Sequence, residues 1–439
     1  MEKIKAGYKQ TDIGLIPADW QVKPISALCD IFNGTTPSTA NPAFWFKGDI
    51  PFCTPSDITS ISGKYIEKTE RNITSLGLAK SAGNLSPVGS LLLCSAATIG
   101  DVKIANRKVL TNQNITSLIC HSVDNEFMYY KFLTLKDQIL KISIGSTFLL
   151  LTKKDIACFK VDIPTLEEQK AIAAALSDVD SLIDSLEQLI NKKHDMKKAM
   201  MQQLLTGKKR LPDFAAQQDD ESNYKQTDIG LIPKDWEVVL VGDLFDFKNG
   251  LNKAKEFFGY GTPIVNYMDV FKLSGLRFNN IQGKVNVTFQ EKQNFSVKKG
   301  DVFFTRTSET VEEIGIASVM LEDCNETVFS GFVLRSRPKS KLIKKDYCQY
   351  CFSSDEARKQ IVSKSTYTTR ALTNGRLLSS VILALPKPEE QKAIAKVLSD
   401  MDKEIDMLKQ RLDKVRLVKM GMMQELLTGK TRLIKTAIA

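Results

Sequence analysis

The sequence is poor in the side chains that most often carry out acid–base or metal chemistry. Its 439 residues include two histidines, His121 and His194, so we expect neither a catalytic histidine nor a histidine-rich metal site. Cys348 and Cys351 have no second Cys or His pair near them, which makes a zinc site improbable. We interpret the eight scattered cysteines as reduced thiols. Carboxylates are plentiful, but no nuclease-like cluster stands out, so we predict no catalytic and no metal residues.

Two short motifs match parts of known functional loops without the context that those loops need. Residues 41–44 (Asn-Pro-Ala-Phe) differ by one residue from the Asn-Pro-Pro-Phe/Tyr loop of DNA amino-methyltransferases, but the 40 residues before them are too few for a cofactor-binding domain. Gly429, Lys430 and Thr431 match the end of a phosphate-binding loop, yet Gln424 replaces its first glycine and the motif follows a helix. We interpret these motifs as a surface loop and a helix cap.

Loop residues that suit nucleic acid are better represented. Hydroxyl and amide side chains can contact phosphates or base edges, amides suit adenine, and an arginine among threonines suits guanine or phosphate. Candidates in the first half are Thr35, Thr36, Ser38, Thr54, Ser56, Asp57, Gln113, Asn114, Ser146 and Thr147. Candidates in the more basic second half are Lys248, Asn249, Asn252, Lys253, Arg306, Thr307, Arg335, Thr368, Thr369 and Arg370. For any one of these residues a solvated loop is the preferred interpretation; as sets they favour nucleic acid.

Composition agrees with a polyanionic partner. The net charge is +10, and 43% hydrophobic and 26% charged residues are typical of a soluble globular protein. The first ten residues are polar, without a signal-peptide core, and no apolar run is long enough to span a membrane. We therefore expect a cytoplasmic protein with no membrane partner.

These loops lie between segments that occur twice. Residues 163–211 return at 385–433 with a shift of 222 positions, and residues 8–22 return at 224–238 with thirteen of fifteen identities. Pro17 and Trp20 of the short repeat are expected to anchor it on a neighbouring element. The intervening segments, residues 25–164 and 239–385, do not resemble each other. Both read as short strands, among them 115–120 and 329–335, with a helix before the end, at 125–142 and 345–363. One scaffold therefore presents two different surfaces.

Each long repeat reads as one helix with a 3.5-residue apolar period, which favours a coiled-coil seam. The seam residues are Ile172, Leu176, Val179, Ile183, Leu186 and Ile190 in the first copy, and Ile394, Leu398, Met401, Ile405, Leu408, Leu412 and Val415 in the second. The period lapses at Lys193, Lys197 and Lys419. Thr165 and Glu168 fit a capping box, and Gly207 and Gly429 fit C-caps.

We predict an α+β fold with two tandem pseudo-symmetric domains, each followed by a long helix, the helices pairing as an antiparallel coiled coil. The predicted segments are a first domain with its lead-in (1–164), helix 1 (165–210), a polar linker (211–223), a second domain with its lead-in (224–387), helix 2 (388–430) and a tail (431–439).

The chain resembles the specificity (S) subunit of type I restriction-modification systems. The resemblance lies in the lead-in TDIGLIPxDW (11–20 and 227–236), the helix starts PxxEEQKAIA (164–173 and 386–395) and the helix ends MMQxLLTGK (200–208 and 422–430). Residues 34–58 (GTTPST…FW…GDIPFCTPSDI) also resemble a known style of target recognition domain. The resemblance covers essentially the whole chain.

The resemblance implies a non-catalytic subunit whose two target recognition domains each read one half of a bipartite site in double-stranded DNA. It implies helices that space the domains and dock two methyltransferase subunits, with motor-nuclease subunits completing a complex that cuts unmethylated DNA. S-adenosylmethionine, ATP and Mg²⁺ would be used by those partners, and this chain would bind no cofactor. The alternatives are a stand-alone methyltransferase or nuclease with an unrecognised site, and a DNA-bridging coiled-coil protein.

Overall fold

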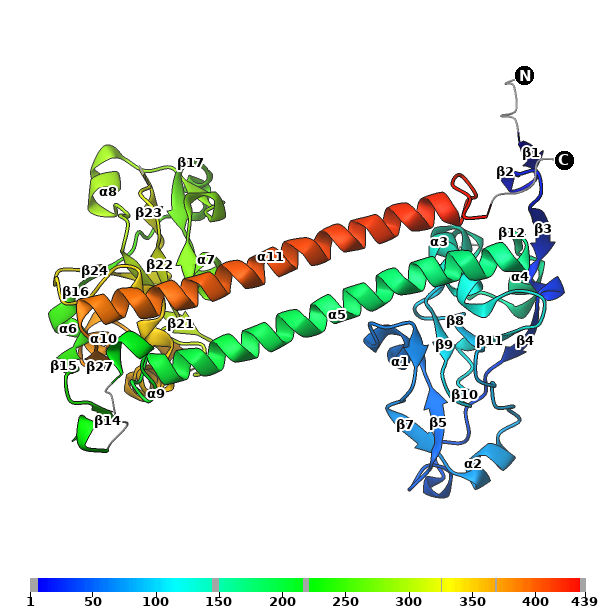
Figure 1. Cartoon of the computed structure of the whole chain (residues 1–439), viewed down its shortest axis with the longest axis horizontal. Coiled ribbons are helices and arrows are strands. Elements are labelled where there is room, and N and C mark those ends of the chain that lie inside the picture. Colours follow the sequence, from blue (N-terminus) through cyan, green and yellow to red (C-terminus); the bar gives the residue numbers. More distant parts are fainter. Residues whose placement is uncertain (1–6, 144–149, 216–220, 325, 368, 435–439) are drawn as a thin grey trace. The chain divides into compact units, whose positions relative to one another are not determined.

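The computed structural model describes residues 7–143, 150–215, 221–324, 326–367 and 369–434. The chain forms two compact units: unit 1 comprises Met1–Gln188 and Lys409–Ala439, and unit 2 comprises Leu189–Leu408. Two 39-residue helices, α5 (Leu166–Leu204) and α11 (Pro388–Leu426), each begin in one unit and end in the other (Figure 1).

Unit 1 is built on a five-stranded sheet, whose order is β4 (Cys29–Asn33), β11 (Ile115–Cys120), β8 (Leu91–Cys94), β9 (Val102–Ala105) and β6 (Tyr65–Ile66). A three-stranded sheet has the order β10 (Leu110–Thr111), β5 (Ile50–Cys53) and β7 (Arg71–Ile73). Two strand pairs complete the unit, β1 (Tyr8–Thr11) with β2 (Gly14–Pro17) and β3 (Gln21–Pro24) with β12 (Lys160–Ile163). Its short helices are α1 (Pro55–Ser60), α2 (Ser75–Lys80) and α4 (Lys153–Cys158). The longer α3 (Asn125–Ser143) packs its aromatic residues into the core.

Unit 2 repeats this topology. Its five-stranded sheet has the order β16 (Phe245–Asn249), β24 (Val333–Pro338), β20 (Val302–Thr305), β22 (Ala317–Met320) and β18 (Gly275–Leu276). The corresponding smaller sheet has the order β19 (Lys284–Val285), β17 (Phe258–Val265) and β23 (Val328–Phe329). The pairs are β13 (Tyr224–Thr227) with β14 (Gly230–Pro233), and β15 (Glu237–Leu240) with β27 (Ile382–Leu385). The short helices are α6 (Val241–Leu244), α7 (Tyr267–Lys272), α8 (Phe289–Asn294) and α10 (Gly375–Ser379). The prediction of one α+β fold used twice, each copy followed by a long helix, is confirmed.

Two elements of unit 2 differ from their sequence-based prediction. The helix expected at residues 345–363 is two 3-10 turns, η7 (Tyr347–Gln349) and η8 (Cys351–Ser353), followed by α9 (Asp355–Lys364). Ser354 caps α9 through a bond from the Ala357 N–H, so the helix starts there, while the aromatic and cysteine side chains before it are buried. The strand expected at 329–335 is interrupted by residues 330–332, which cross from the smaller sheet to the larger one.

The two long helices are antiparallel within each unit. In unit 1, Lys419 pairs with Asp180 at 2.5 Å and Arg416 with Glu187 at 2.6 Å. In unit 2, Lys193 pairs with Glu404 at 2.6 Å, and Lys197 pairs with Asp402. All thirteen predicted seam residues are buried or half-buried. Their burial is what pairing through this stripe requires.

Lysines stand where the apolar period of the helices lapses, and each forms an ion pair with an acidic residue of the other helix. Lys419 and Lys197 occupy equivalent positions, and the ammonium of each lies over a tyrosine ring, that of Tyr130 at 5.5 Å and that of Tyr350 at 5.4 Å. The hydroxyl of Tyr130 donates to Asp180 at 2.6 Å, and that of Tyr350 donates to Asp402 at 2.9 Å. The same Lys–Asp–Tyr cluster thus joins the two helices to the domain in each unit.

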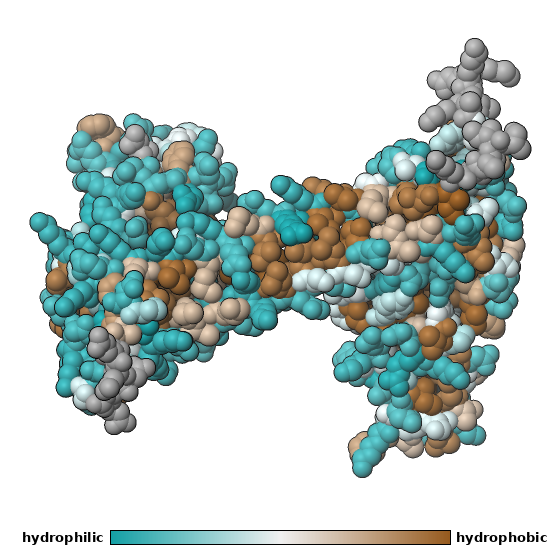
Figure 2. Space-filling model, viewed as in Figure 1, coloured by the Kyte–Doolittle hydropathy of each residue, from teal (hydrophilic) through white to brown (hydrophobic). Residues whose placement is uncertain are grey.

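Apolar side chains also remain exposed on the paired helices, where Figure 2 shows apolar surface. On α5, after its exposed first residue Leu166, they recur every seven residues, one position before a seam residue or its lysine substitute, at Leu182, Leu189 and Met196. On α11 they are Met407, Leu417, Val418 and Met420. Each unit therefore carries some of them.

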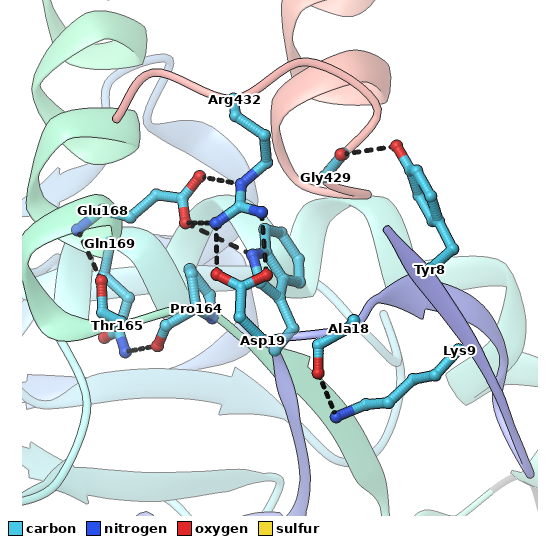
Figure 3. Close-up of polar contacts among 11 residues, drawn as sticks. Tyr8, Lys9, Ala18, Asp19, Pro164, Thr165, Glu168, Gln169, Gly429 and Arg432 are labelled. Carbon is cyan, nitrogen blue, oxygen red and sulfur yellow. Dashed lines mark hydrogen bonds and ion pairs between the residues drawn. The ribbon is translucent and has the colours of Figure 1, made fainter. Parts of the chain in front are cut away.

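The ends of the helices are held by a buried carboxylate in each unit. In unit 1, Glu168 at the start of α5 accepts from Arg432, which follows α11, at 2.6 and 2.7 Å (Figure 3). The other edge of that guanidinium binds Asp19 at 2.9 and 2.6 Å, and the buried Trp20 indole donates to Glu168 at 3.3 Å. These bonds bring the lead-in, the start of α5 and the end of α11 together. The predicted anchoring role of Trp20 is confirmed.

This arrangement corrects the predicted capping box. Thr165 does accept from the Glu168 N–H at 3.4 Å, but the Glu168 carboxylate is directed to Arg432 and Trp20. A charge-assisted bidentate pair is stronger than the reciprocal bond of a capping box, which explains why the Glu168 carboxylate binds Arg432 instead of the Thr165 N–H.

Unit 2 holds the other ends of the helices in the same way. Arg210, after α5, binds Glu390 at the start of α11 at 2.8 and 2.6 Å. It also binds Asp235 at 3.0 and 2.9 Å, and the Trp236 indole donates to Glu390 at 3.1 Å. The repeated lead-in is therefore a clamp for helix ends, and sequence reasoning had not assigned a role to either arginine.

Candidate nucleic-acid interface

The predicted contact loops of unit 1 gather at one end of its five-stranded sheet. Strand β4 ends at Asn33, paired with Thr116, and β8 ends at Cys94, paired with Ile115. The loop after β4 is therefore beside the loop before β11. Two side chains bridge these loops directly, since the Thr36 hydroxyl donates to the Gln113 amide oxygen.

The predicted residues of unit 1 differ in accessibility. Thr36, Ser38, Ser56 and Gln113 are exposed, and Thr35, Thr54 and Asn114 are half-buried. Ser146 and Thr147 lie outside the described residues. The accessible side chains of this predicted set therefore carry hydroxyl and amide groups.

Asp57 has a structural position that argues against the predicted DNA contact. Its buried carboxylate accepts from the Thr54 N–H at 2.8 Å, the Thr54 hydroxyl at 2.6 Å and the Glu70 N–H at 2.7 Å. These bonds cap α1 and tie it to a neighbouring loop. The sequence motif Thr-Pro-Ser-Asp is a capping box, a signal that sequence reasoning could have used.

Unit 2 places its loops at the equivalent end of its sheet. Strand β16 ends at Asn249, paired with Leu334, and β20 ends at Thr305, paired with Val333. In both units, the loop after the edge strand of this sheet (β16 or β4) closely approaches the loop before the adjacent strand (β24 or β11). A Cβ atom at Gly250 would lie 2.1 Å from the Ser330 carbonyl oxygen, and one at Gly34 would lie 2.0 Å from that of Asn112. Glycine is required at both positions because the backbones touch there.

A small sheet extends the loop end of unit 2. It has the order β21 (Thr307–Ser308), β26 (Ala371–Leu372) and β25 (Thr366–Tyr367). The Thr373 N–H donates to the Arg306 carbonyl at 3.0 Å. This sheet brings four of the predicted residues together, namely Arg306, Thr307, Thr369 and Arg370. Thr368 lies outside the described residues.

Arg306 and Arg370 keep their donors available. Among the residues that the structure describes, neither guanidinium has a hydrogen bond or an ion pair; Arg370 is exposed and Arg306 is half-buried. An unpaired guanidinium presents the fork of donors that suits phosphate or the edge of guanine.

Three other basic residues predicted for DNA contact are engaged inside the fold. Arg335 is 7% exposed, donates to the Ser296 carbonyl at 2.8 Å and lies over the Phe329 ring. Burial lowers its pKa. Lys253 pairs with Glu291 at 2.9 Å, and Lys248 donates to the Asn294 carbonyl at 2.5 Å. The burial of Arg335 argues against its predicted DNA contact, because β24 is covered on both faces from Val333 to Ser336.

The Asn252 side chain and the exposed Asn249 complete the predicted set at this end. Sequence reasoning missed two exposed aromatic rings of the same loops, Phe332 with 66% and Tyr367 with 60% of its surface exposed. Phe332 lies in an apolar-rich run that does not distinguish it from core residues, whereas Tyr367 lies in the polar stretch at residues 364–370, whose composition indicates an exposed loop.

The motifs with possible chemistry have ordinary structural positions. Asn41 caps a single 3-10 turn, η2 (Pro42–Phe44), by accepting from the Ala43 N–H at 3.1 Å. Cys348 and Cys351 are buried, and burial raises the pKa of Cys351. Gly429 follows α11 with a φ of 69°.

The described part of the chain has neither a metal-binding cluster nor a helix that could cross a membrane. Outside residues 1–6, 144–149, 216–220, 325, 368 and 435–439, no three His, Cys, Asp or Glu side chains are grouped so as to hold a metal ion. Within these same limits, no helix has both the length and the apolar content to cross a membrane.

The sequence matches a protein-family model twice. The model is described as "Type I restriction modification DNA specificity domain", and it matches residues 17–193 and 233–417. Among similar proteins, the type I restriction enzyme MjaIX specificity subunit of Methanocaldococcus jannaschii is 29% identical over 391 residues, which cover 88% of this chain and 87% of the relative. The type I restriction enzyme EcoKI specificity subunit of Escherichia coli is 20% identical, with 88% and 82% covered.

Solved structures share the fold at low identity. The S subunit of a type I restriction-modification system from M. genitalium has a TM-score of 0.52 at 14% identity, with 97% of each chain covered. A chain from a study of complex assembly and conformational transition in the type I R-M system has a TM-score of 0.57 at 14% identity, covering 95% of this chain and 99% of that one.

Proposed function

Since this chain belongs to the family of type I restriction-modification DNA specificity subunits, we propose that it selects the DNA sequence on which a restriction-modification complex acts, without catalysis of its own. The observation that carries the proposal is the use of one sheet topology twice with unlike side chains at the same loop end. A common scaffold with different contact residues is what reading two different half-sites requires.

The chemistry of the two loop ends supports different half-sites. Unit 1 offers amides and hydroxyls, including the bridged Thr36 and Gln113, and an amide suits the edge of adenine. Unit 2 offers the guanidinium groups of Arg306 and Arg370, which no residue in the described part of the chain binds and which suit guanine. Each unit would read one half of a bipartite site in double-stranded DNA.

The paired helices would space the half-sites and dock partner subunits. Apolar side chains exposed on the paired helices support docking, because such side chains can pack against another amphipathic helix: Leu182, Leu417, Val418 and Met420 in unit 1, and Leu189, Met196 and Met407 in unit 2. Their presence in both units supports the docking of two methyltransferase subunits. These partners would use S-adenosylmethionine to methylate adenine.

Motor-nuclease subunits, using ATP and Mg²⁺, would add cleavage of unmethylated DNA. The complex would act on DNA in the cytoplasm, and the present chain would contribute neither a cofactor site nor a metal site. Its contribution is the choice of sequence.

The proposal is tested by mapping N6-methyladenine across the host genome with and without this gene. We expect deletion to remove one gapped, two-part motif, and the wild-type gene to restore it. Complementation with an Arg306→Ala, Arg370→Ala double variant should lose methylation at that motif, whereas Asp30→Asn, an exposed change outside the loop end, should restore it. If the host map does not change, the chain is co-expressed with the type I methyltransferase subunit of the same host. The absence of a methylated gapped motif in that experiment would refute the proposal.

A further inference from the structure

We propose that Phe332 is a specificity-determining residue of unit 2, whose ring packs against the 5-methyl group of a thymine in the half-site. This inference rests on the proposed function and names one base contact within it. In the major groove, thymine differs from the other bases by this methyl group, and an aromatic ring is among the side chains that contact it.

The backbone at Phe332 is fixed while its ring is exposed. The Phe332 N–H donates to the Ser330 hydroxyl at 3.3 Å, and its carbonyl accepts from the Arg306 N–H at 3.3 Å. The neighbouring Gly331 N–H donates to the Leu251 carbonyl at 2.8 Å. The ring nevertheless has 66% of its surface exposed. It is thus presented on a rigid support, so little conformational entropy would be lost on contact with DNA.

The surroundings of Phe332 suit a base pair next to a guanine. The hydrogen bond that the Phe332 carbonyl accepts from the Arg306 N–H places Phe332 beside Arg306. The Arg306 guanidinium is unpaired among the described residues. Through Thr373 and β26, Arg306 connects to the small sheet that carries the exposed Tyr367 and Arg370. An apolar ring among donors that suit guanine or phosphate is therefore part of the same surface.

The equivalent position in unit 1 supports a reading role. Phe332 directly precedes β24, and its counterpart by strand order is Asn114, which directly precedes β11. Gly250 and Gly34 approach these two loops in the same way. An amide at one position and a ring at the other have unlike base preferences, adenine and thymine. A residue that served only the fold would not need to differ in this way.

Phe278 provides a matched control within the same unit. It follows β18, which runs parallel to β22, with Leu276 paired to Met320 at the end of β22. Because β22 is antiparallel to β20, Phe278 lies at the end of the sheet away from Thr305 and the contact loops. Its ring is also exposed, by 44%.

The test measures methylation of synthetic duplexes by the chain assembled with the type I methyltransferase subunit of the same host. Each thymine of both half-sites is replaced in turn by uracil, which removes only the methyl group. For the wild type we expect the rate to fall about fourfold at one thymine, the effect of losing one buried methyl contact. For Phe332→Ala we expect thymine and uracil to be used equally there, and Phe332→Leu should retain part of the preference. Phe278→Ala should behave as wild type.

The outcomes separate this inference from the proposed function. If the wild-type assembly methylates a gapped motif but no thymine is sensitive, or Phe332→Ala keeps the wild-type preference, the contact is refuted and the specificity role stands. A sensitive thymine whose effect persists in Phe332→Ala belongs to another residue and equally refutes it. If the wild-type assembly methylates no gapped motif at all, the proposed function fails and the inference fails with it.

Discussion

At the scale of the residue, replacing each of two glycines at the end of α11 by alanine should have opposite effects on stability. Gly421 lies inside the helix with no atom near its missing Cβ, whereas Gly429 has a φ of 69° and a Cβ there would lie 2.3 Å from Pro17. We expect Gly421→Ala to stabilise the protein by up to ~1 kcal/mol because alanine is the better helix former. Gly429→Ala should destabilise it by ~1 kcal/mol or more. Urea unfolding of both variants measures the change in the free energy of unfolding. Changes of the same sign in the two variants would contradict the prediction.

The clamp in unit 1 predicts an acid-dependent loss of stability. The hydrogen bonds from Arg432 lower the pKa of Asp19 below its ordinary value, and a carboxyl with an ordinary pKa titrates near ~3.9. The lowered pKa means that the stabilisation is present above this pH and is lost as the pH falls through the folded-state pKa.

Asp19→Asn should therefore cost about 1 kcal/mol at pH 7, the upper range for a partly exposed pair. The difference from wild type should narrow below about pH 4. Thermal unfolding across this pH range measures the effect, with the exposed Asp30→Asn as control. A difference that stayed constant down to the lowest pH would show that the charge of Asp19 is not what stabilises the clamp.

At the scale of the element, the lapses in the helix seam have a structural cause. Lysine interrupts the apolar period at residues 197 and 419 because its ammonium is paired with an aspartate of the other helix and lies over a tyrosine of the domain. Partly buried polar pairs fix register and orientation at a cost in stability. The clusters thus favour the antiparallel register over alternatives that an uninterrupted apolar seam would allow.

Asp180→Ala tests this cluster in unit 1. It removes the partner of Lys419, which is 19% exposed, and the acceptor of the Tyr130 hydroxyl. We expect a loss of ~1–3 kcal/mol in the free energy of unfolding, the cost of leaving partly buried polar groups unpaired. Asp178→Ala, an exposed change on the same helix, should stay within ~0.5 kcal/mol of wild type. Equal losses of stability in the two variants would show that the bonds of Asp180 to Lys419 and Tyr130 do not stabilise the protein.

At the scale of the whole molecule, the proposed spacing role of the helices makes a prediction in base pairs. Seven residues added to α5 and seven to α11, where each helix passes from one unit to the other, preserve the seam and lengthen each helix by ~10 Å. We expect the methylated motif to gain about three base pairs between its halves. The same seven residues inserted in the linker at 212–215 should leave the spacer unchanged. A lengthened variant that still methylates the original spacing would contradict the spacing role.

Independent reading by the two units predicts a modular change of specificity. We expect exchange of residues 25–164 for the equivalent domain of another family member to change one half of the methylated motif and leave the other half intact. The motif is read by methylation mapping of the host that carries the chimaera. A change in both halves would argue against independent readers.

Much of the fold could be predicted because it depends on local or repeated patterns. The long helices follow from their apolar period, and α3 and β11 from uninterrupted runs. The 3-10 turns before α9 could not be predicted, because Tyr347, Cys348 and Cys351 are buried by long-range packing that no period reports. The candidate site was harder to predict, since Arg335 and Arg306 are both arginines in strand-rich stretches. Only tertiary packing buries Arg335 within β24 and leaves the Arg306 guanidinium without a partner among the described residues.

The sequence by itself determined that two unlike domains share one scaffold, because near-identical segments encode near-identical local structure. It also determined the helices, whose amphipathic stripe is written in the spacing of their residues. Only the tertiary structure decided which loops meet at the end of each sheet and that Arg432 and Arg210 hold the helix ends. These contacts join residues up to 413 positions apart. Contacts of that range depend on strand order and packing, which the spacing of residues along the chain does not encode.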